Sequence, residues 1–481
     1  MRKVIEHTVL LVFLIPLFFI NIKSSHDWGD DFAQYIHQAK NISEGISQNN
    51  TGYIFNSDLF LGPQAYPTGF PLLLTPFIKQ YGFNFMVLNY TMTIFLVIAS
   101  LFGFLFLRKH FSFLAAFFTT LIIAYNPIFL NFKTEVVSDL AFTSFLLVSV
   151  YLIFKSKTIA TALLLGLMLA FLAHIRAIGL LVIFVFLIHE LIIVTSIKEF
   201  SLHRHQKTLI SLFSFAVLYF ILKFAFPCET NYPSFFEFNG LCNRINEHVS
   251  YNFLALSYFF NIYEPKTQYF IGVIGSAALV TFSTLGYFYE WKEHKFNFIN
   301  LFVLVYIIFI AVFQFGDTGL RFISPILFFI FFYAIVAIKK VLQPFNLNYK
   351  LASLVFGLIL LLSYKPSIEK IIENQNITVD GPCTDSSYEA FNFIKSLQLT
   401  NEVIVFEKPR ALALFTNTKS VALKNNLNNV EIKKQLQKFK AQFVLLNIHL
   451  SNEALSYYLV SDTLNNQLVF TNSEYKLFKL R

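Results

Sequence analysis

The chain has 481 residues, of which 56% are hydrophobic and only 14% are charged. Ordinary soluble domains carry about 25% charged residues, so most of this surface cannot face water. The net charge of +9 does not indicate a nucleic-acid partner, because the Lys and Arg residues stand at the ends of apolar runs and form no basic stripe. The composition therefore predicts a protein whose main solvent is lipid.

Membrane helices are predicted from apolar runs that are mostly near the roughly 20 residues a bilayer requires. Eleven such runs lie at 4–22, 83–107, 111–130, 138–154, 158–174, 177–195, 208–226, 269–289, 297–315, 321–338 and 351–365. No small-residue cleavage site follows the first run, so we expect a retained helix and not a signal peptide. His174 and Arg176 interrupt the fifth and sixth runs, and joining those runs into one helix would invert everything downstream.

The charges at the run ends predict the topology. With the N-terminus in the cytoplasm, the basic clusters between runs, such as Arg108 with Lys109 and Lys339 with Lys340, fall on the cytoplasmic side. The segments 23–82, 131–139, 227–268 and everything after about 366 then lie outside. We therefore expect an inner-membrane protein whose outer, periplasmic face carries most of the non-membrane mass.

The sequence pattern changes after residue 366, where the long apolar runs end. Helix patterns at 388–397 and 431–439 alternate with strand patterns at 403–406, 443–446, 468–470 and 475–480. The fold class predicted is an all-α polytopic membrane domain over 1–366, followed by a small α/β domain over 367–481. This second domain has no Gly-rich phosphate loop and no metal-ligand spacing. Lys408 and Arg410 follow a predicted strand, where solvated charges are ordinary.

All three cysteines fall outside in this topology, where an oxidising compartment permits disulfides. A bridge between Cys228 and Cys242 would close the base of the outer loop 227–268. The third cysteine, Cys383, would then stay unpaired, and sequence alone does not decide the pairing.

Three acidic residues, Asp27, Asp30 and Asp31, follow the first apolar run within five positions. Apolar or small residues recur at helical spacing from 30 to 42, which predicts a helix lying in the membrane interface. Asp31 and Tyr35 would share one face of that helix. Capping of the helix N-terminus is the alternative to a catalytic role, although three acids exceed what one cap needs.

A second acidic pair, Glu135 and Asp139, stands four residues apart at the mouth of the fourth run. Ionisable groups at the edge of an apolar helix are expensive, which makes them functional candidates. The alternative is again an N-cap, provided by Ser138 or by Asp139.

Two arginines, Arg176 and Arg321, also stand at outer helix ends. A guanidinium suits phosphate binding because it stays charged and offers a fork of donors. Such a side chain can equally extend to lipid headgroups. Acids and arginines on one face together indicate a reaction on a lipid-linked phosphate.

Four segments resemble the membrane glycosyltransferases of family 39, a group of the GT-C superfamily that includes protein O-mannosyltransferases and the lipid A aminoarabinose transferase. They are Asp30-Asp31-Phe32-Ala33-Gln34-Tyr35, Tyr66-Pro67-Thr68-Gly69-Phe70-Pro71, Ser138-Asp139 and Arg321-Phe322-Ile323-Ser324-Pro325. The C-terminal segment 406–415 is also similar to the outer domain of uncharacterised bacterial members. The resemblance covers almost the whole chain.

The resemblance implies transfer of a sugar from a polyprenyl-phosphate carrier to a lipid, glycan or protein acceptor on the outer face, with inversion. It places the general base at Asp31. Many members carry a second acid directly after this position, whereas here Phe32 follows Asp31 and the second acid, Asp30, precedes it. Asp30 is therefore the other candidate for the base. Arg176 and Arg321 would then bind the donor phosphate.

The same resemblance implies a second role, which is to orient the acceptor or a metal ion. The residues expected to do this are Asp139, Glu135 and Tyr35. A phosphate-binding lysine of the aminoarabinose transferase has no counterpart in Thr68-Gly69-Phe70. A divalent cation is therefore a candidate cofactor.

Two other function classes are open at this point. A flippase or transporter for lipid-linked oligosaccharides usually places ionisable groups near the bilayer midplane, whereas these cluster at one interface. A polysaccharide polymerase would rely more on arginines in a large outer loop. The sugar, the carrier length and the acceptor depend on pocket shape and have no motif.

Overall fold

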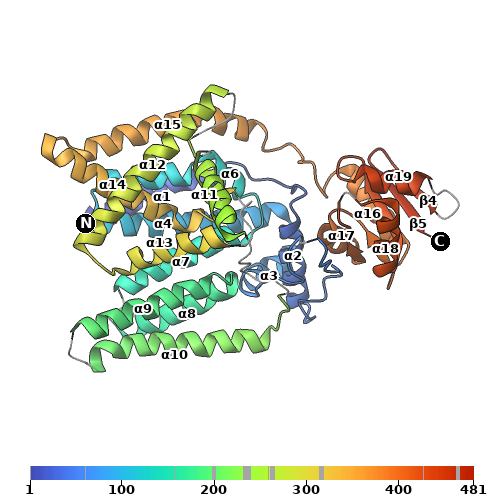
Figure 1. The fold of residues 1–481 in the computed structure, drawn as a ribbon, viewed down its shortest axis with the longest axis horizontal. Helices are drawn as coiled ribbons and strands as arrows, with labels where there is room; N and C mark the ends of the chain where they lie inside the picture. Colours follow the sequence, from blue (N-terminus) through green and yellow to red (C-terminus); the bar gives the residue numbers. More distant parts are fainter. Residues whose placement is uncertain are drawn as a thin grey trace.

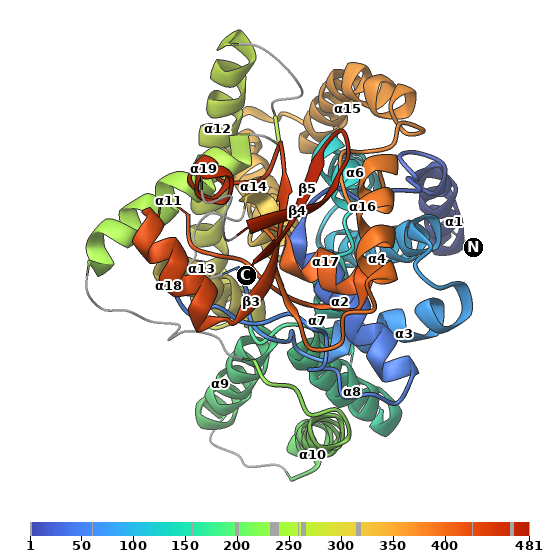
Figure 2. The ribbon, with the colours of Figure 1, turned by 90° about the vertical axis from the view of Figure 1, so that its right-hand side faces the viewer.

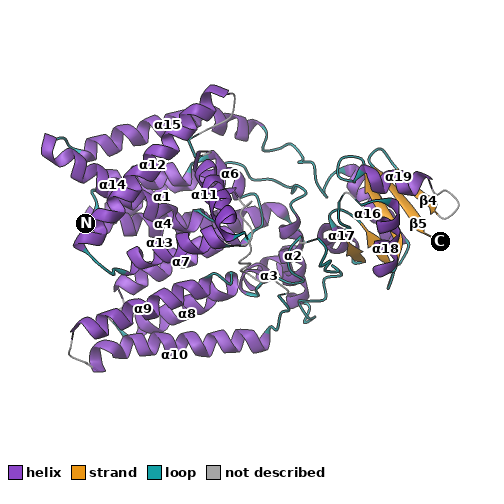
Figure 3. Ribbon diagram, in the orientation of Figure 1, coloured by secondary structure: helices purple, strands orange, loops and turns teal. Residues whose placement is uncertain are grey.

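The computed structural model describes residues 2–59, 61–155, 158–197, 202–230, 240–257, 259–260, 266–313, 319–425, 427–461 and 466–480. Figure 1 shows a large bundle of helices that contains the N-terminus and a smaller unit that contains the C-terminus. The named strands all belong to the smaller unit (Figure 3). The predicted fold class, a helical membrane domain followed by a small α/β domain, is therefore confirmed.

Every predicted apolar run contains a helix. The helices are α1 (Arg2–Leu14) with the 3-10 turn η1 (Ile15–Phe18), α4 (Phe85–His110), α5 (Phe113–Ala124), α6 (Pro127–Phe132), α7 (Ser138–Lys155), α8 (Ile159–Ile175), α9 (Gly179–Ile197), α10 (Leu202–Ala225), α12 (Lys266–Glu293), α13 (Phe298–Val312), α14 (Leu327–Leu342) and α15 (Tyr349–Glu373). In the described part of the chain, six helical segments are long and apolar enough to cross a membrane. They correspond to α4, α7, α10, α12, α14 with its flanking 3-10 turns, and α15.

Polar caps and turns explain why fewer helices reach spanning length than the apolar runs suggested. Asn126 caps α6 and Pro127 follows it, which divides the third run into α5 and α6. Thr158 begins α8 with a capping box. Arg176 has extended backbone (φ −147°, ψ 138°) and separates α8 from α9. The fifth and sixth runs are therefore two helices, as predicted.

Two helices of the first outer loop, α2 (Asp30–Ser43) and α3 (Gly69–Tyr81), lie between the bundle and the C-terminal unit (Figure 1). The predicted helix from residue 30 is thus present. Every residue of α2 from Phe32 to Ala39 is buried, because α3 and a helix of the C-terminal unit pack against it. Protein therefore covers the apolar face that the sequence suggested for a membrane interface.

The C-terminal unit is a mixed sheet with helices packed around it. Its strands are β1 (Val403–Val405), β2 (Lys419–Val421), β3 (Ala441–Asn447), β4 (Asn466–Thr471) and β5 (Tyr475–Leu480), in the order β2-β1-β3-β5-β4. Strands β2, β1 and β3 are parallel, whereas β5 is antiparallel to both β3 and β4. Its helices are α16 (Asp385–Ser396), α17 (Pro409–Thr416), α18 (Asn429–Lys438) and α19 (Glu453–Ser461). Helix α15 runs past the domain boundary expected after residue 366.

The first outer loop extends this sheet at its β2 edge. Ser420 donates its backbone N–H to the carbonyl of Gly52 at 2.9 Å and accepts from the N–H of Ile54 at 2.8 Å. The Asn56 side chain adds a bond to the carbonyl of Ala422 at 2.9 Å. Figure 2 shows the sheet lying over the end of the bundle. Backbone pairing therefore docks the C-terminal domain on the membrane domain.

The second outer loop contains α11 (Leu241–Ser257), while residues 231–239, 258 and 261–265 of it lie outside the described residues. The thiols of Cys228 and Cys242 are both free, with Cys228 half-buried and Cys242 exposed. The predicted bridge between them is not formed in this structure. Cys383 is also free and is buried in the C-terminal part.

Candidate active site

Four ionisable side chains predicted from the sequence lie in one cluster where the bundle meets the first outer loop: Asp31, Asp139, Arg176 and Arg321. They come from the first turn of α2, the second position of α7, the residue after α8, and the last residue of the 3-10 turn η2 (Gly319–Arg321). Helix ends leave backbone groups that need polar partners, and charge is less costly there than within an apolar helix. Helix termination therefore delivers these charges to one place.

Asp139 is the buried centre of the cluster. Its side chain has 0% exposed area. One carboxylate oxygen accepts a hydrogen bond from Arg176 Nη1. The other accepts from Arg321 Nε at 3.2 Å and Nη2 at 3.1 Å. A carboxylate this deeply buried is stable only when donors and positive charge surround it, so Asp139 organises the two arginines in addition to starting α7.

Arg321 connects the two acids that the sequence placed apart. Its Nη2 also donates to Asp31 Oδ2 at 3.1 Å. The side chains of Arg176 and Arg321 are 20% and 30% exposed. Arg321 Nη1, and Nε and Nη2 of Arg176, make no hydrogen bond to any described residue. Both guanidinium groups therefore keep donors available for an anion.

The structure distinguishes Asp31 from Asp30. The Asp31 side chain is 27% exposed, whereas that of Asp30 is 11% exposed and its nearest cation is Arg410, with Nε at 3.5 Å. Burial acts to raise the pKa of Asp31, but Arg321, Arg410 and the Tyr66 hydroxyl outweigh it and hold that pKa below its ordinary value. Burial raises the pKa of Asp30 to about 6, because its neighbours compensate less. Asp31 is thus the more accessible acid and the one more readily ionised.

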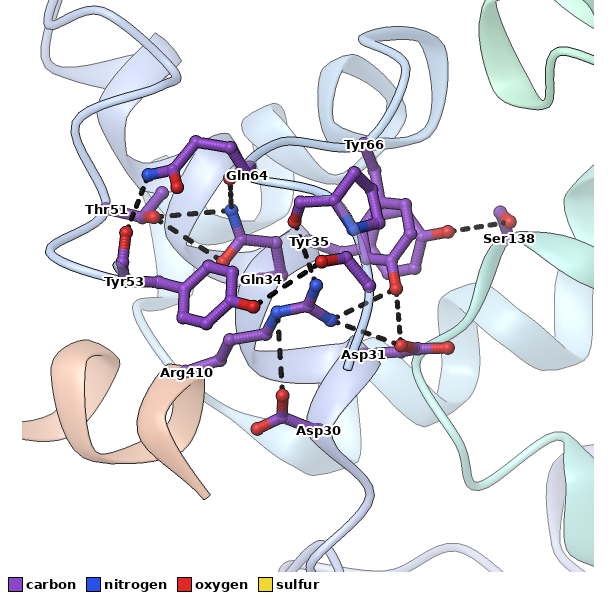
Figure 4. Close-up of polar contacts among 12 residues, drawn as sticks. Asp30, Asp31, Gln34, Tyr35, Thr51, Tyr53, Gln64, Tyr66, Ser138 and Arg410 are labelled. Atoms are coloured by element: carbon purple, nitrogen blue, oxygen red, sulfur yellow. Dashed lines mark hydrogen bonds and ion pairs between the residues drawn. The ribbon is translucent and has the colours of Figure 1, made fainter. Parts of the chain in front are cut away.

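Three hydroxyl groups connect α2 to its surroundings (Figure 4). Tyr66 donates to Asp31 Oδ1. Tyr35, predicted to share a helix face with Asp31, stacks on Tyr66 with ring centroids 4.4 Å apart. Its own hydroxyl meets Ser138 Oγ at 3.0 Å. Tyr35 therefore joins α2 to the start of α7, next to Asp139.

Glu135 lies close to the cluster without joining it. Burial raises the pKa of its carboxyl to about 7, and Asp27 adds to this effect while Arg321 opposes it. The side chain forms no ion pair with a described residue. Its predicted role in orienting the acceptor stays a prediction.

Arg410 is the site residue that the sequence interpretation missed. Its position after a strand predicts a solvated charge, but its side chain is 0% exposed and reaches Asp31 Oδ1 at 3.3 Å from α17 (Figure 4). Ala413 and Leu414, three and four residues further along, are both buried. This spacing is helical, but the eight residues of α17 are too few for it to identify an inward face from the sequence.

The fit of a metal ion can be judged from the side chains near the cluster. Among the described residues, no group of three or more His, Cys, Asp or Glu side chains is placed to hold one. Both oxygens of Asp31 and both of Asp139 already accept from arginine or tyrosine. A bound cation would have to displace these contacts, so the predicted divalent ion has no ready set of ligands in this arrangement.

No protein-family model and no curated protein matches the sequence. Solved structures do match it: ArnT from Cupriavidus metallidurans in the apo state is 11% identical with a TM-score of 0.56, covering 98% of this chain and 97% of that one. The same protein bound to undecaprenyl phosphate gives 10% identity, a TM-score of 0.56 and the same coverage. The Archaeoglobus fulgidus oligosaccharyltransferase in complex with Zn and sulfate is 14% identical with a TM-score of 0.60, covering 95% of this chain and 69% of that one. At such identities the similarity establishes the fold alone, and this chain shares its fold with these two solved proteins.

Proposed function

We propose that this protein is an inverting membrane glycosyltransferase that moves a sugar from a polyprenyl-phosphate carrier to an acceptor hydroxyl. The observation that carries the proposal is the meeting of Asp31, Asp139, Arg176 and Arg321 in one partly exposed cluster. A transferase acting on a glycosyl phosphate needs a base for the acceptor and cations for the departing phosphate, and the cluster contains both. The similar fold that was solved with undecaprenyl phosphate supports the class of carrier.

Asp31 is the general base in this proposal. The acceptor oxygen attacks the anomeric carbon, the bond from that carbon to the phosphate oxygen breaks, and its electron pair leaves with the phosphate. The acceptor proton passes to Asp31 and later to water. A carboxylate of lowered pKa is adequate, because the hydroxyl becomes acidic only as the new bond forms. Asp30, more deeply buried and with a raised pKa, is the weaker candidate.

The spare donors of Arg176 and Arg321 would bind the phosphate. The departing group gains negative charge as the bond breaks, so donors fixed in place stabilise the transition state more than the ground state. The Asp139 carboxylate neutralises part of the positive charge of Arg176 and Arg321 and holds both guanidinium groups in position. Product release is easier for that reason, because the phosphate does not meet two uncompensated cations.

Two further polar groups, those of Tyr35 and Glu135, would orient the acceptor. Tyr35 is bonded to Ser138, and Glu135 keeps an unpaired carboxyl next to the cluster. Either group can donate a hydrogen bond to a sugar or peptide hydroxyl, or accept one from it.

The proposed location is the cytoplasmic membrane, with residues 1–366 as the membrane domain and 367–481 outside it. The N-terminus lies at the bundle end opposite the C-terminal domain (Figure 1), as the charge rule requires if that domain is periplasmic. The cluster then opens towards the outer face.

The test is sugar transfer by proteoliposomes that contain the full chain and undecaprenyl-phosphate sugars with a radiolabelled hexose or pentose. Asp31→Asn should reduce transfer by about 10²- to 10⁴-fold, because the base is lost while the shape is kept. Asp27→Asn is the matched control: Asp27 is in the same acidic run but 51% exposed, and asparagine retains its acceptor for the Gly29 N–H. The control should transfer at the wild-type rate.

Full activity of Asp31→Asn would overturn the assignment of the base. Movement of lipid-linked sugar across the liposome membrane without any glycoside product would identify a transporter instead. Growth of a polymer on the carrier itself would identify a polymerase.

A further inference from the structure

Arg410 and Asp31 meet although 379 positions separate them in the chain. The Arg410 guanidinium donates to Asp31 Oδ1 at 3.3 Å, to the Tyr66 hydroxyl at 3.1 Å and to the carbonyl of Pro63 at 2.9 Å. Its Nε faces Asp30 Oδ2 at 3.5 Å. A cation of the C-terminal domain therefore touches both acids at the start of α2 (Figure 4).

The first outer loop forms a shaped seat for this side chain. The guanidinium carbon lies 4.8 Å from the ring centroid of Tyr53 and 5.1 Å from that of Tyr66. Gly62 has φ +136°, and a Cβ added there would come within 2.4 Å of Arg410 Nη2. Two aromatic faces, a carbonyl and a glycine thus accommodate one arginine, which is far more than a surface ion pair requires.

Docking of the domain alone does not explain a charge at this position. Backbone pairing of Gly52 and Ile54 with Ser420 already holds the domain, and Lys438 pairs with Asp58 at 2.7 Å on the surface. An apolar side chain in the seat would avoid the desolvation cost of a fully buried guanidinium, and such replacements are often neutral or stabilising. The charge of Arg410 therefore acts on the charged groups around it, and the nearest of these is Asp31, the proposed base, at 3.3 Å.

We propose that Arg410 is a positioning residue of the active site, so that the C-terminal domain completes the catalytic centre. Arg410 and Tyr66 fix Oδ1 of Asp31, whereas Arg321 fixes Oδ2, which sets the orientation of the carboxylate. The two arginines also keep Asp31 ionised. This inference rests on the proposed role of Asp31 as the base.

The test compares Arg410→Met and Arg410→Lys in the same transfer assay as a function of pH. Arg410→Met should lower kcat by roughly 10- to 100-fold, because a base displaced by a fraction of an ångström loses its alignment. It should also move the acid limb of the kcat profile to higher pH, since Asp31 loses one of the charges that lower its pKa. Arg410→Lys keeps the charge but not the fork of donors, so the acid limb should stay while kcat falls less.

The matched control is Lys438→Met, which breaks the exposed contact between the same domain and the same loop. It should leave both the rate and the pH profile unchanged. A second variant, Arg410→Ala, is assayed with added methylguanidinium, which should restore part of the rate by occupying the vacated seat. For each variant, limited proteolysis of the linkage, which is the segment 374–384 between α15 and α16, shows whether the C-terminal domain remains docked.

The possible failures are separable. An unmoved acid limb in Arg410→Met, with the domain docked and Asp31→Asn inactive, would overturn the role of Arg410 and leave the proposed function standing. A domain that undocks in every Arg410 variant, with no rescue by methylguanidinium, would assign Arg410 to docking and also overturn the proposal. An active Asp31→Asn would instead refute the proposed base itself.

Discussion

Asp139→Asn should destabilise the protein through the two arginines that Asp139 holds. The side chain is 0% exposed, and its oxygens accept from Arg176 Nη1 and from Nε and Nη2 of Arg321. Asparagine preserves the shape and one acceptor oxygen, but it removes the charge and directs an NH₂ group at a guanidinium. Two cations then share the space with Asp31 as the nearest remaining counter-charge.

The size of the effect follows from burial. Breaking a fully buried ion pair by removing one partner costs about 3–5 kcal/mol. Here the carboxylate is buried, whereas the arginine side chains are 20% and 30% exposed, so water screens part of the loss. We therefore expect a decrease of about 2–3 kcal/mol in the free energy of unfolding.

Reversible unfolding in mixed detergent micelles, followed by circular dichroism, measures this quantity. The exposed Asp27→Asn should change it by less than about 0.5 kcal/mol. The double variant Asp139→Asn/Arg176→Met should be more stable than Asp139→Asn alone, because it removes one of the two uncompensated cations. A double variant that is as unstable as the sum of its single changes would refute the reasoning.

Two further predictions concern Gly62 and Glu135. Gly62→Ala should loosen the docked domain and reduce transfer, because the added Cβ would overlap the Arg410 guanidinium at a position with a φ of +136°. Limited proteolysis of the linkage measures the loosening. Faster cleavage is expected, and cleavage at the wild-type rate would contradict the prediction. The raised pKa of Glu135 means that the folded protein keeps, between about pH 4.5 and 7, a proton that the unfolded chain has released. The free energy of unfolding should therefore fall as pH rises through this window. Glu135→Gln should be more stable than the wild type at pH 8 and equal to it near pH 4, and the same difference at both pH values would disprove this.

Much of the fold could be predicted because membrane helices are encoded locally. A long apolar run has few alternatives in lipid, where backbone groups must bond within the helix. The split at Arg176 was predictable for the same reason, since a charge interrupts the run. The number of spanning helices was less predictable, because caps such as Asn126 shorten a helix without changing the hydropathy around it.

The C-terminal domain shows where local patterns become insufficient. Helices α16 and α18 and the strands β1, β3, β4 and β5 were predicted, but α17, β2 and α19 were not. These elements have eight, three and nine residues, too few to display a clear period. Two of them, α17 and β2, contact the first outer loop, so the missed elements include those that complete the site.

The sequence by itself determined that the chain is a helical membrane protein, and it identified Asp31, Asp139, Arg176 and Arg321 as candidates, because hydropathy and helix ends are properties of neighbouring residues. Only the tertiary structure decided their partners. An ion pair forms wherever the fold brings two charges together, and no local pattern connects Asp31 with Arg410 across 379 positions. A buried arginine and a solvated one look alike in sequence, and they differ only in what packs around them.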